Sequence, residues 1–189
     1  MMGVPGTEAG TEAAALIREY NVGGIMFFAE NVVTPAQVQR FTAELQQLAR
    51  TSGAGWPLFI SIDQEGGRVV RIKEGVTPLP SAMALGAAGS EQLAEKVGRI
   101  VGEELAALGI NMNAAPVLDV NNNPHNPVIG TRSFGEDPHA VAKLGTAFMR
   151  GLQAAGLLAI GKHFPGHGDT DVDSHLALPT IAHARERLN

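Results

Sequence analysis

Short apolar segments alternate with longer amphipathic segments along this chain, and this alternation constrains the fold more than any other feature. Residues 23–28, 58–62, 112–120 and 157–160 are apolar and predict buried strands, and helical patterns lie between them. Strands that alternate with helices pair in parallel, through right-handed crossovers. We find no internal repeat and no low-complexity linker. The sequence therefore predicts an α/β fold, with residues 1–189 forming one domain.

The boundaries of three helices can be predicted from single residues. Thr34 and Asp137 each stand before a proline, which is typical of an N-cap followed by proline at the first helical position. Ser90 is expected to cap the helix between these two, and Gly109 to end it. The apolar side chains expected to face the core from this middle helix are Leu93, Val97, Ile100, Val101, Leu105 and Leu108.

Polar residues follow three of the predicted strands. Asp63, Asp119 and Lys162 each stand just past the carboxyl end of a strand, where both barrels and open parallel sheets place their active sites. An open nucleotide-binding sheet would carry a G-x-G-x-x-G turn after its first strand, and this chain does not. A complete (β/α)8 barrel needs roughly 250 residues. We therefore predict a TIM barrel truncated to about the first five β/α units.

The composition excludes several classes of function. The 189 residues are 44% hydrophobic, with a formal net charge of −5 and no cysteine. The mild acidity argues against a nucleic-acid partner, since phosphate binding normally needs a basic face. The lack of cysteine excludes disulfides and thiolate catalysis. No segment is long and apolar enough to predict a membrane span, and the first ten residues do not resemble a signal peptide. A cytoplasmic location is the default expectation, although an N-terminal truncation could hide a signal.

The segment GKHFPGHGDTDVDSH, residues 161–175, concentrates unusual chemistry. It holds three of the six histidines and three aspartates. Asp173 and His175 are two residues apart, and a carboxylate beside an imidazole fixes its tautomer and raises its proton affinity. Histidine has an unperturbed pKa of about 6.5, which suits general acid/base catalysis. The segment therefore predicts a proton-transfer dyad on a loop, with Lys162 and His163 at its base as donors to ligand hydroxyls.

Two other interpretations of this segment compete with the dyad. An Asp-x-His pair on a loop is more often a surface hydrogen bond than a catalytic pair. A zinc site could use His163, His167, Asp169 and His175 as imidazole and carboxylate ligands. The spacing of the first two histidines suits a metal only on a helix, and Pro165–Gly166 breaks a helix here. We therefore expect no metal and no cofactor.

Three long motifs resemble one known family. KHFPGHGDTDVDSH resembles the signature loop of the bacterial β-N-acetylhexosaminidases of glycoside hydrolase family 3. SIDQEGGRVVRI, residues 61–72, is similar to the family's third-strand segment, and residues 114–138 are similar to its fourth strand and long loop. The resemblance covers nearly the whole chain in the right order. It implies that the chain is the N-terminal part of the family's barrel domain.

The resemblance also implies an activity. It predicts a retaining exo-glycosidase that removes terminal N-acetyl-β-glucosamine, typically from peptidoglycan fragments, with His175 as general acid/base and Asp173 as its partner. Most glycosidases use two carboxyl groups, and here histidine would replace one of them. In the family the nucleophile is an aspartate after a later strand, which would lie past Asn189. The 189-residue chain is therefore expected to be inactive, and its last residues to begin another helix.

The same resemblance assigns the sugar-binding residues. Those implied for the subsite before the scissile bond are Asp63, Arg71, Arg132, Lys162 and His163. A carboxylate can accept two hydroxyl hydrogen bonds, and arginine and lysine supply directional donors. His167 and Asp169 are expected to support the loop.

Less specific roles compete with these assignments. Arg132 could pair with Glu136 or Asp137, Arg71 could be a solvated charge, and Asp63 could cap its own loop. We take Asp119 as structural, ordering residues 121–123.

Two other functions stay open at this point. One is a module that binds N-acetylglucosamine without turnover. The other is a family 3 hydrolase of β-glucosidase type, against which the D-S-H triplet argues. Phosphate in place of water as the acceptor also stays open, and the sequence does not predict the oligomeric state.

Overall fold

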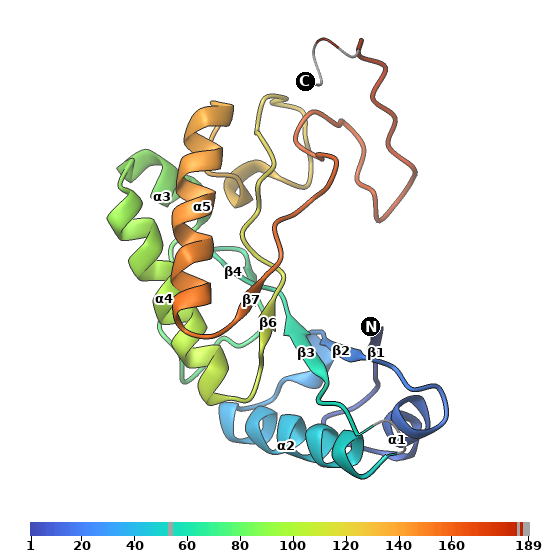
Figure 1. Cartoon of the computed structure of the whole chain (residues 1–189). Helices are drawn as coiled ribbons and strands as arrows, with labels where there is room; N and C mark the ends of the chain where they lie inside the picture. The colour runs from blue at the N-terminus through green and yellow to red at the C-terminus, as the bar shows by residue number, and fades with distance from the viewer. Residues whose placement is uncertain (53–54, 185, 187–189) are drawn as a thin grey trace.

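A five-stranded parallel sheet forms the centre of the computed structural model, which describes residues 1–52, 55–184 and 186 (Figure 1). Its strands are β1 (Met2–Gly3), β2 (Gly24–Phe27), β3 (Phe59–Ile62), β6 (Met112–Asn113) and β7 (Leu158–Ala159). They are ordered β1-β2-β3-β6-β7, and every neighbouring pair is parallel. Sequential order with helical crossovers is that of a (β/α)8 barrel. The predicted fold class is confirmed, and the barrel is not closed within the described residues.

The crossover helices cover one face of the sheet. Their bounds are α1 (Thr11–Arg18), α2 (Pro35–Thr51), α4 (Glu91–Ala107) and α5 (Pro138–Ala154), with a short α3 (Ala82–Ala88) before α4. Two 3-10 segments span Ala29–Asn31 and Gly130–Arg132, and a hairpin of β4 (Gln64–Gly66) and β5 (Val69–Val70) follows β3. Figure 1 shows α4 and α5 side by side near β6 and β7, with α1 and α2 near the other edge.

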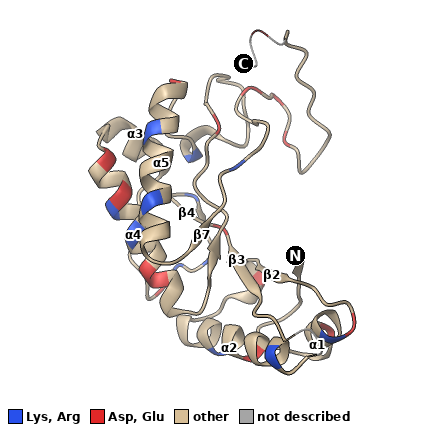
Figure 2. Cartoon of the chain, in the orientation of Figure 1, with Lys and Arg blue, Asp and Glu red and all other residues tan. Residues whose placement is uncertain are grey.

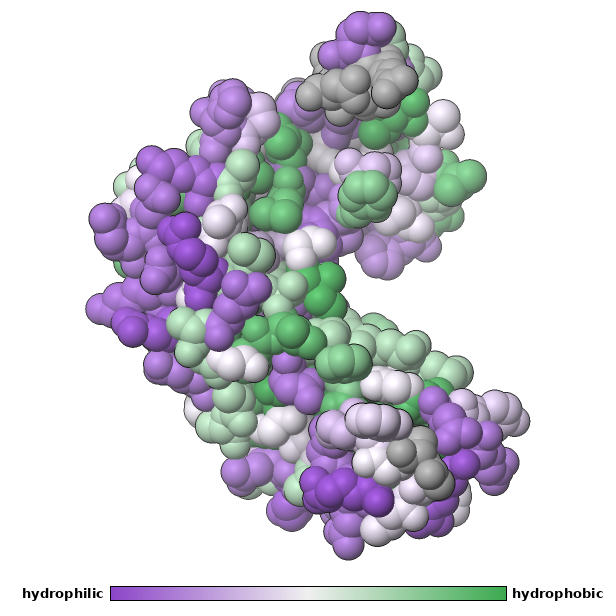
Figure 3. Space-filling view, in the orientation of Figure 1, coloured by the Kyte–Doolittle hydropathy of each residue, from purple (hydrophilic) through white to green (hydrophobic). Residues whose placement is uncertain are grey.

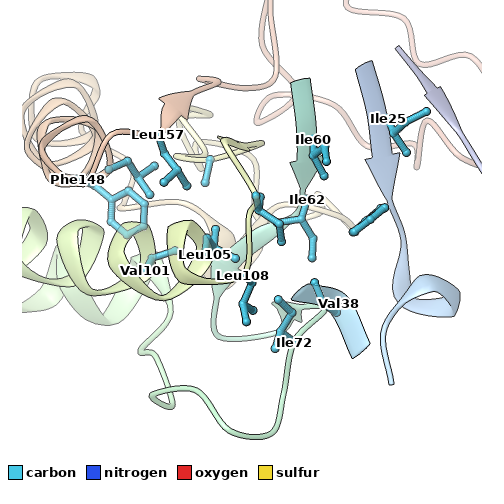
Figure 4. Packing of buried hydrophobic residues seen from close by; sticks show 14 of the residues in the cluster. Ile25, Val38, Ile60, Ile62, Ile72, Val101, Leu105, Leu108, Phe148 and Leu157 are labelled. Carbon is cyan, nitrogen blue, oxygen red and sulfur yellow. The ribbon is translucent and has the colours of Figure 1, made fainter. Parts of the chain in front are cut away.

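The hydrophobic core lies between the sheet and these helices (Figure 4). Ile25 and Ile60 are neighbours in the register, and both are fully buried against side chains such as Val38 of α2. Burying one such aliphatic side chain contributes about 1.5–3 kcal/mol. The core therefore holds the strands in register and fixes where their carboxyl ends lie.

The other face of the sheet is apolar and partly open. Phe59 and Leu158 alternate with core residues along their strands, and each is 48% exposed. Figure 3 shows apolar surface in the hollow between the α1–α2 end of the molecule and the segment after β7. This face corresponds to the interior of a barrel, where side chains from all strands pack in layers.

The predicted helix caps are confirmed. The Thr34, Ser90 and Asp137 side chains accept hydrogen bonds from the backbone N–H of Gln37, Leu93 and His139 at 3.2, 3.2 and 3.0 Å. Gly109, just past the end of α4, has φ +78°, a conformation that glycine adopts without steric cost.

One prediction about regular structure is wrong, and another lies partly outside the described residues. Of residues 112–120, only Met112–Asn113 form a strand, and Val117 makes one isolated bridge to Lys162. Pro116 interrupts the ladder because proline has no N–H to donate. The helix expected near the end of the chain falls partly on residues 185 and 187–189, which lie outside the described residues. Residues 178–184 have no regular structure, and Glu186 is helical.

The inward face of α4 also differs from the prediction. Leu93 is 41% exposed and Ile100 is only partly buried, whereas Ala94 and Gly98 are buried. A Cβ on Gly98 would lie 2.2 Å from the carbonyl oxygen of Phe148 in α5. The two helices therefore meet through small residues, and this contact turns the larger Leu93 towards solvent.

Acidic and basic side chains are mixed on the outer helices (Figure 2). Glu91 lies 3.1 Å from Lys143 and 3.8 Å from Arg150, and these side chains are 38% exposed or more. Such exposed pairs contribute only about 0–1 kcal/mol. None of the described helices is both long enough and apolar enough to cross a membrane.

Candidate active site

The first part of the candidate site surrounds Asp63, just after β3. Asp63 Oδ1 lies 2.6 Å from Lys162 Nζ, and Asp63 Oδ2 lies 3.2 Å from Arg71 Nη2. Burial opposes ionisation of Asp63, but the hydrogen bonds and charges of Lys162 and Arg71 outweigh it and hold the pKa of this carboxyl below its usual value. The structure thus brings together three predicted sugar-binding residues. Asp63 binds cations rather than capping its loop, and Arg71 is paired rather than solvated.

Glu65 joins this cluster to Arg132. Arg132 Nε and Nη2 donate to the two Glu65 oxygens at 2.9 and 2.8 Å, and Lys162 Nζ lies 2.6 Å from Glu65 Oε1. Burial disfavours the charged guanidinium, but Glu65 outweighs this and raises the pKa of Arg132. The partners considered for Arg132 from the sequence, Glu136 and Asp137, are therefore wrong. Sequence analysis missed Glu65, although its position two residues after Asp63 on the same face could have revealed it.

A buried glutamine fixes the direction of these two carboxylates. Gln64 Oε1 accepts from the backbone N–H of Arg71 and Ile72 at 2.9 and 3.1 Å, and its Nε2 donates to the Ile72 carbonyl at 2.9 Å. The tight turn between β4 and β5 contains Gly66 and Gly67, with φ of +94° and +58°. Because Gln64 cross-links the hairpin, its neighbours Asp63 and Glu65 point to the opposite side, towards Lys162.

Asp119 holds the start of the histidine-rich loop. Its Oδ2 accepts from the backbone N–H of His163 at 3.2 Å and lies 2.5 Å from His163 Nδ1, and its Oδ1 accepts from the N–H of His167 at 2.6 Å. Burial opposes its ionisation, yet these bonds outweigh it and lower the pKa of Asp119. Asp119 is structural, but its carboxylate orders residues 163–167 rather than residues 121–123.

His163 lies between this anchor and the cation cluster. Its Nε2 is 3.4 Å from Arg132 Nη2, while its Nδ1 faces Asp119. This arrangement suits a neutral ring with the proton on Nδ1, because Nε2 then accepts from the guanidinium. His163 thus lies with the other predicted sugar-binding residues.

The predicted dyad forms on the exposed part of the loop. His175 Nδ1 lies 2.7 Å from Asp173 Oδ1, which also accepts from the His175 N–H at 2.9 Å. The backbone N–H of His175, followed by its ring, lowers the pKa of Asp173. The carboxylate holds Nδ1, so Nε2 is the nitrogen able to transfer a proton. The His175 side chain is 78% exposed, and the dyad has no hydrogen bond to Asp63, Lys162 or Arg132 within the described part of the chain.

His167 and Asn126 anchor the base of this loop. His167 is buried, with Nδ1 2.7 Å from Thr170 Oγ1 and Nε2 3.0 Å from Ser174 Oγ. Asn126 Nδ2, from the loop after β6, donates to the carbonyls of His167 and Thr170 at 2.7 and 2.9 Å. His167 therefore supports the loop next to the dyad. Asn126 was not predicted, because its partners are more than 40 residues away.

The four residues considered as zinc ligands have separate partners. His163 binds Asp119, His175 binds Asp173, and Asp169 Oδ2 lies 3.1 Å from His183 Nε2. Among the described residues, no group of three or more potential ligands is arranged to hold a metal ion.

Comparisons with known proteins show the family of this chain. The family model "Glycosyl hydrolase family 3 N terminal domain" matches residues 1–189. Beta-hexosaminidase A of Pseudoalteromonas piscicida is 50% identical over 182 residues, covering 94% of this chain and 30% of the relative. Beta-hexosaminidase of Pseudomonas aeruginosa is 39% identical, covering 100% of this chain and 55% of the relative.

Solved structures give the same result. A family 3 beta-N-acetylglucosaminidase from Paenibacillus sp. str. FPU-7 matches with a TM-score of 0.96 and 59% identity, over 100% of this chain and 36% of that one. NagZ from Neisseria gonorrhoeae matches with a TM-score of 0.89 and 37% identity, over 100% and 55%. This chain thus spans about half or less of the relatives it matches. It belongs to glycosyl hydrolase family 3 and carries the family's N-terminal domain.

Proposed function

We propose that this domain serves a retaining exo-glycosidase that releases terminal N-acetyl-β-glucosamine from peptidoglycan-derived or related glycosides. The observation that carries the proposal is the Asp173–His175 pair, with 2.7 Å between carboxylate and ring. The pair belongs to the loop that begins with the ligand-binding candidates Lys162 and His163. Relatives named beta-hexosaminidase and beta-N-acetylglucosaminidase support the choice of sugar.

In this proposal the cluster at the strand ends binds the terminal sugar. Asp63 accepts hydrogen bonds from hydroxyl groups, and Arg71, Arg132, Lys162 and His163 donate them. The side chains of Asp63, Lys162 and Arg132 are only 10–15% exposed. Their hydrogen bonds to a sugar would form away from bulk water, where electrostatic interactions are stronger.

The dyad supplies the proton transfers. His175 Nε2 gives a proton to the leaving oxygen, and Asp173 stabilises the imidazolium before that step. In the second step the neutral ring takes a proton from water as it attacks the sugar. The double displacement also needs a nucleophile, which we assign to an aspartate outside these 189 residues. In this proposal residues 1–189 are one incomplete barrel domain, and the location is cytoplasmic.

Hydrolysis of an aryl N-acetyl-β-glucosaminide by the full-length gene product tests the function. His175→Ala should lower kcat at least 100-fold, because general acid/base catalysis typically contributes 10²–10⁴-fold. Asp173→Asn keeps the shape of the pair but makes the His175 ring a weaker base. We therefore expect kcat to fall by less than in His175→Ala. His139→Ala, on α5, is a control that should keep full activity.

The outcomes separate the possible functions. Unchanged turnover in His175→Ala would show that the dyad assignment is wrong. Binding of N-acetylglucosamine without turnover would favour a binding module, and stronger inhibition by glucose than by N-acetylglucosamine would favour a β-glucosidase. Cell fractionation tests the location.

A further inference from the structure

We propose that Glu65 is a positioning residue, which directs Lys162 and Arg132 towards the ligand without touching it. The proposal rests on the proposed function and adds a residue to the binding site. Glu65 contacts both cations, and its side chain is only 5% exposed. Asp63, by comparison, is 15% exposed and Arg71 is 30% exposed.

The ammonium group of Lys162 shows how this positioning works. Lysine has three N–H donors. One points to Asp63 Oδ1 and one to Glu65 Oε1, both at 2.6 Å. With two donors bound to two different carboxylates, the direction of the third is also fixed by the tetrahedral geometry of the ammonium group. No third partner is found for Lys162 Nζ among the described residues, so that donor is available to a ligand hydroxyl.

The guanidinium group of Arg132 is held more completely. Of its five N–H donors, Nε–H and one on Nη2 bind Glu65 in the bidentate geometry, at 2.9 and 2.8 Å. Nη2 also lies 3.4 Å from His163 Nε2, and Nη1 lies 3.4 Å from the Val128 carbonyl. In the part of the chain that the structure describes, this leaves one Nη1 donor for a ligand. Arginine in a bidentate pair cannot rotate without breaking both bonds.

The balance of charge gives Glu65 a second effect. Three cations, Arg71, Lys162 and Arg132, face two carboxylates, Asp63 and Glu65. Removing the Glu65 charge would leave Asp63 as the one carboxylate in direct ion pairs with this group among the described residues, with Asp119 acting on Arg132 only through its charge. Lys162 and Arg132 would then repel each other and compete for Asp63. Asp63, the proposed acceptor for sugar hydroxyl groups, would then be occupied by these cations. Lys162 and Arg132, the proposed donors, would at the same time move away from the ligand.

A double-mutant cycle on ligand binding by the full-length gene product tests this role. The readouts are the inhibition constant for N-acetylglucosamine, and kcat and KM for the aryl glycoside. We expect Glu65→Gln and Arg132→Met each to raise the inhibition constant at least tenfold. In the Glu65→Gln background, Arg132→Met should add less than threefold, because the guanidinium is already displaced.

A matched control comes from the outer helices. Glu91 also contacts two cations, Lys143 and Arg150, but it lies on α4 with an exposed side chain. Glu91→Gln should change neither the inhibition constant nor KM.

If Glu65→Gln fails to fold, Glu65→Asp replaces it, because the shorter side chain keeps the charge but cannot reach both cations. The same non-additive result is expected.

The outcomes separate this inference from the proposed function. An unchanged inhibition constant in a folded Glu65 variant, or additive effects of the two substitutions, would overturn the positioning role while leaving the enzyme assignment intact. Neither binding nor turnover in the wild-type protein would overturn both. A tenfold rise in the inhibition constant together with non-additive effects supports the positioning role. If Glu65 were purely structural, Arg132→Met would raise the inhibition constant equally in the wild-type and Glu65→Gln backgrounds.

Discussion

The Asp119 carboxylate gives the most direct test of the energetics at this site. Its side chain is fully buried, and it accepts hydrogen bonds from the backbone N–H groups of His163 and His167 and faces His163 Nδ1. Asp119→Asn keeps the volume but replaces one acceptor oxygen by a donor. If the remaining oxygen faces His167, the N–H of His163 loses its acceptor.

The expected loss of stability can be worked out from these contacts. A hydrogen bond to a charged group contributes about 1.5–3 kcal/mol, and a buried donor left unsatisfied costs about 1–3 kcal/mol. These two contributions cannot simply be added, because the His163 ring can change its tautomer and then no longer needs an acceptor at Nδ1. We therefore expect the free energy of unfolding to fall by about 3 kcal/mol at pH 7.

The pH dependence has a definite sign. The pKa of Asp119 is lowered in the folded protein, whereas an unperturbed aspartate has a pKa of about 3.9. The carboxylate therefore contributes its full stability well above pH 3.9 and loses it as the pH falls through the folded pKa. The difference between wild type and Asp119→Asn should be smaller at pH 3 than at pH 7.

Urea unfolding followed by circular dichroism at these two pH values measures the effect. Asp137→Asn is the control, because asparagine replaces aspartate at an N-cap with little loss, and Asp137 caps α5 on the surface. A loss below about 0.5 kcal/mol, which is typical of an ordinary surface substitution, would refute the reasoning. The reasoning would also be refuted if the difference in free energy of unfolding between wild type and Asp119→Asn were the same at pH 7 and pH 3.

Two further predictions concern the packing around the site. Asn126→Ala removes the hydrogen bonds to the His167 and Thr170 carbonyls. Amide hydrogen exchange in residues 163–170 should therefore accelerate at least tenfold, which corresponds to a loss of about 1.4 kcal/mol in the free energy of opening. Unchanged exchange would contradict the anchoring role of Asn126. Gly151→Ala places a Cβ 2.1 Å from the Glu95 carbonyl oxygen, so α4 and α5 must separate. Thermal unfolding should show that the free energy of unfolding falls by about 1–3 kcal/mol, whereas Gly23→Ala, with no atom within 4 Å of the added Cβ, should show no such loss.

Local features of the fold could be predicted, and contacts between distant segments could not. Thr34, Ser90 and Asp137 cap their helices because a cap depends only on the next three residues. The face of α4 depends instead on α5, and hydrophobicity alone does not show that Gly98 would be an interface residue. The structure therefore differs from the prediction at Leu93.

The same distinction applies to the site. The Asp173–His175 pair is two residues apart, and its geometry followed from the sequence. Asp63 and Lys162 were expected together because both follow parallel strands. The contact between Glu65 and Arg132 spans 67 residues and requires the turn after Glu65 to face the loop after β6. No local pattern encodes that juxtaposition, so the wrong partners were considered for Arg132.

Asp119 connects the two parts of the site. One of its oxygens holds His163, which lies against Arg132 in the proposed sugar-binding cluster. The other holds the N–H of His167, at the start of the loop that carries the dyad. The proposed sugar-binding cluster around Asp63 and Glu65 is fixed by ion pairs at the strand ends. The dyad is joined to this cluster mainly through the first residues of its loop, which Asp119 holds. A change in the cluster should therefore alter affinity first, and a change in the loop should alter proton transfer first. A change at Asp119 should reach both, because a single buried carboxylate orients one residue of each part.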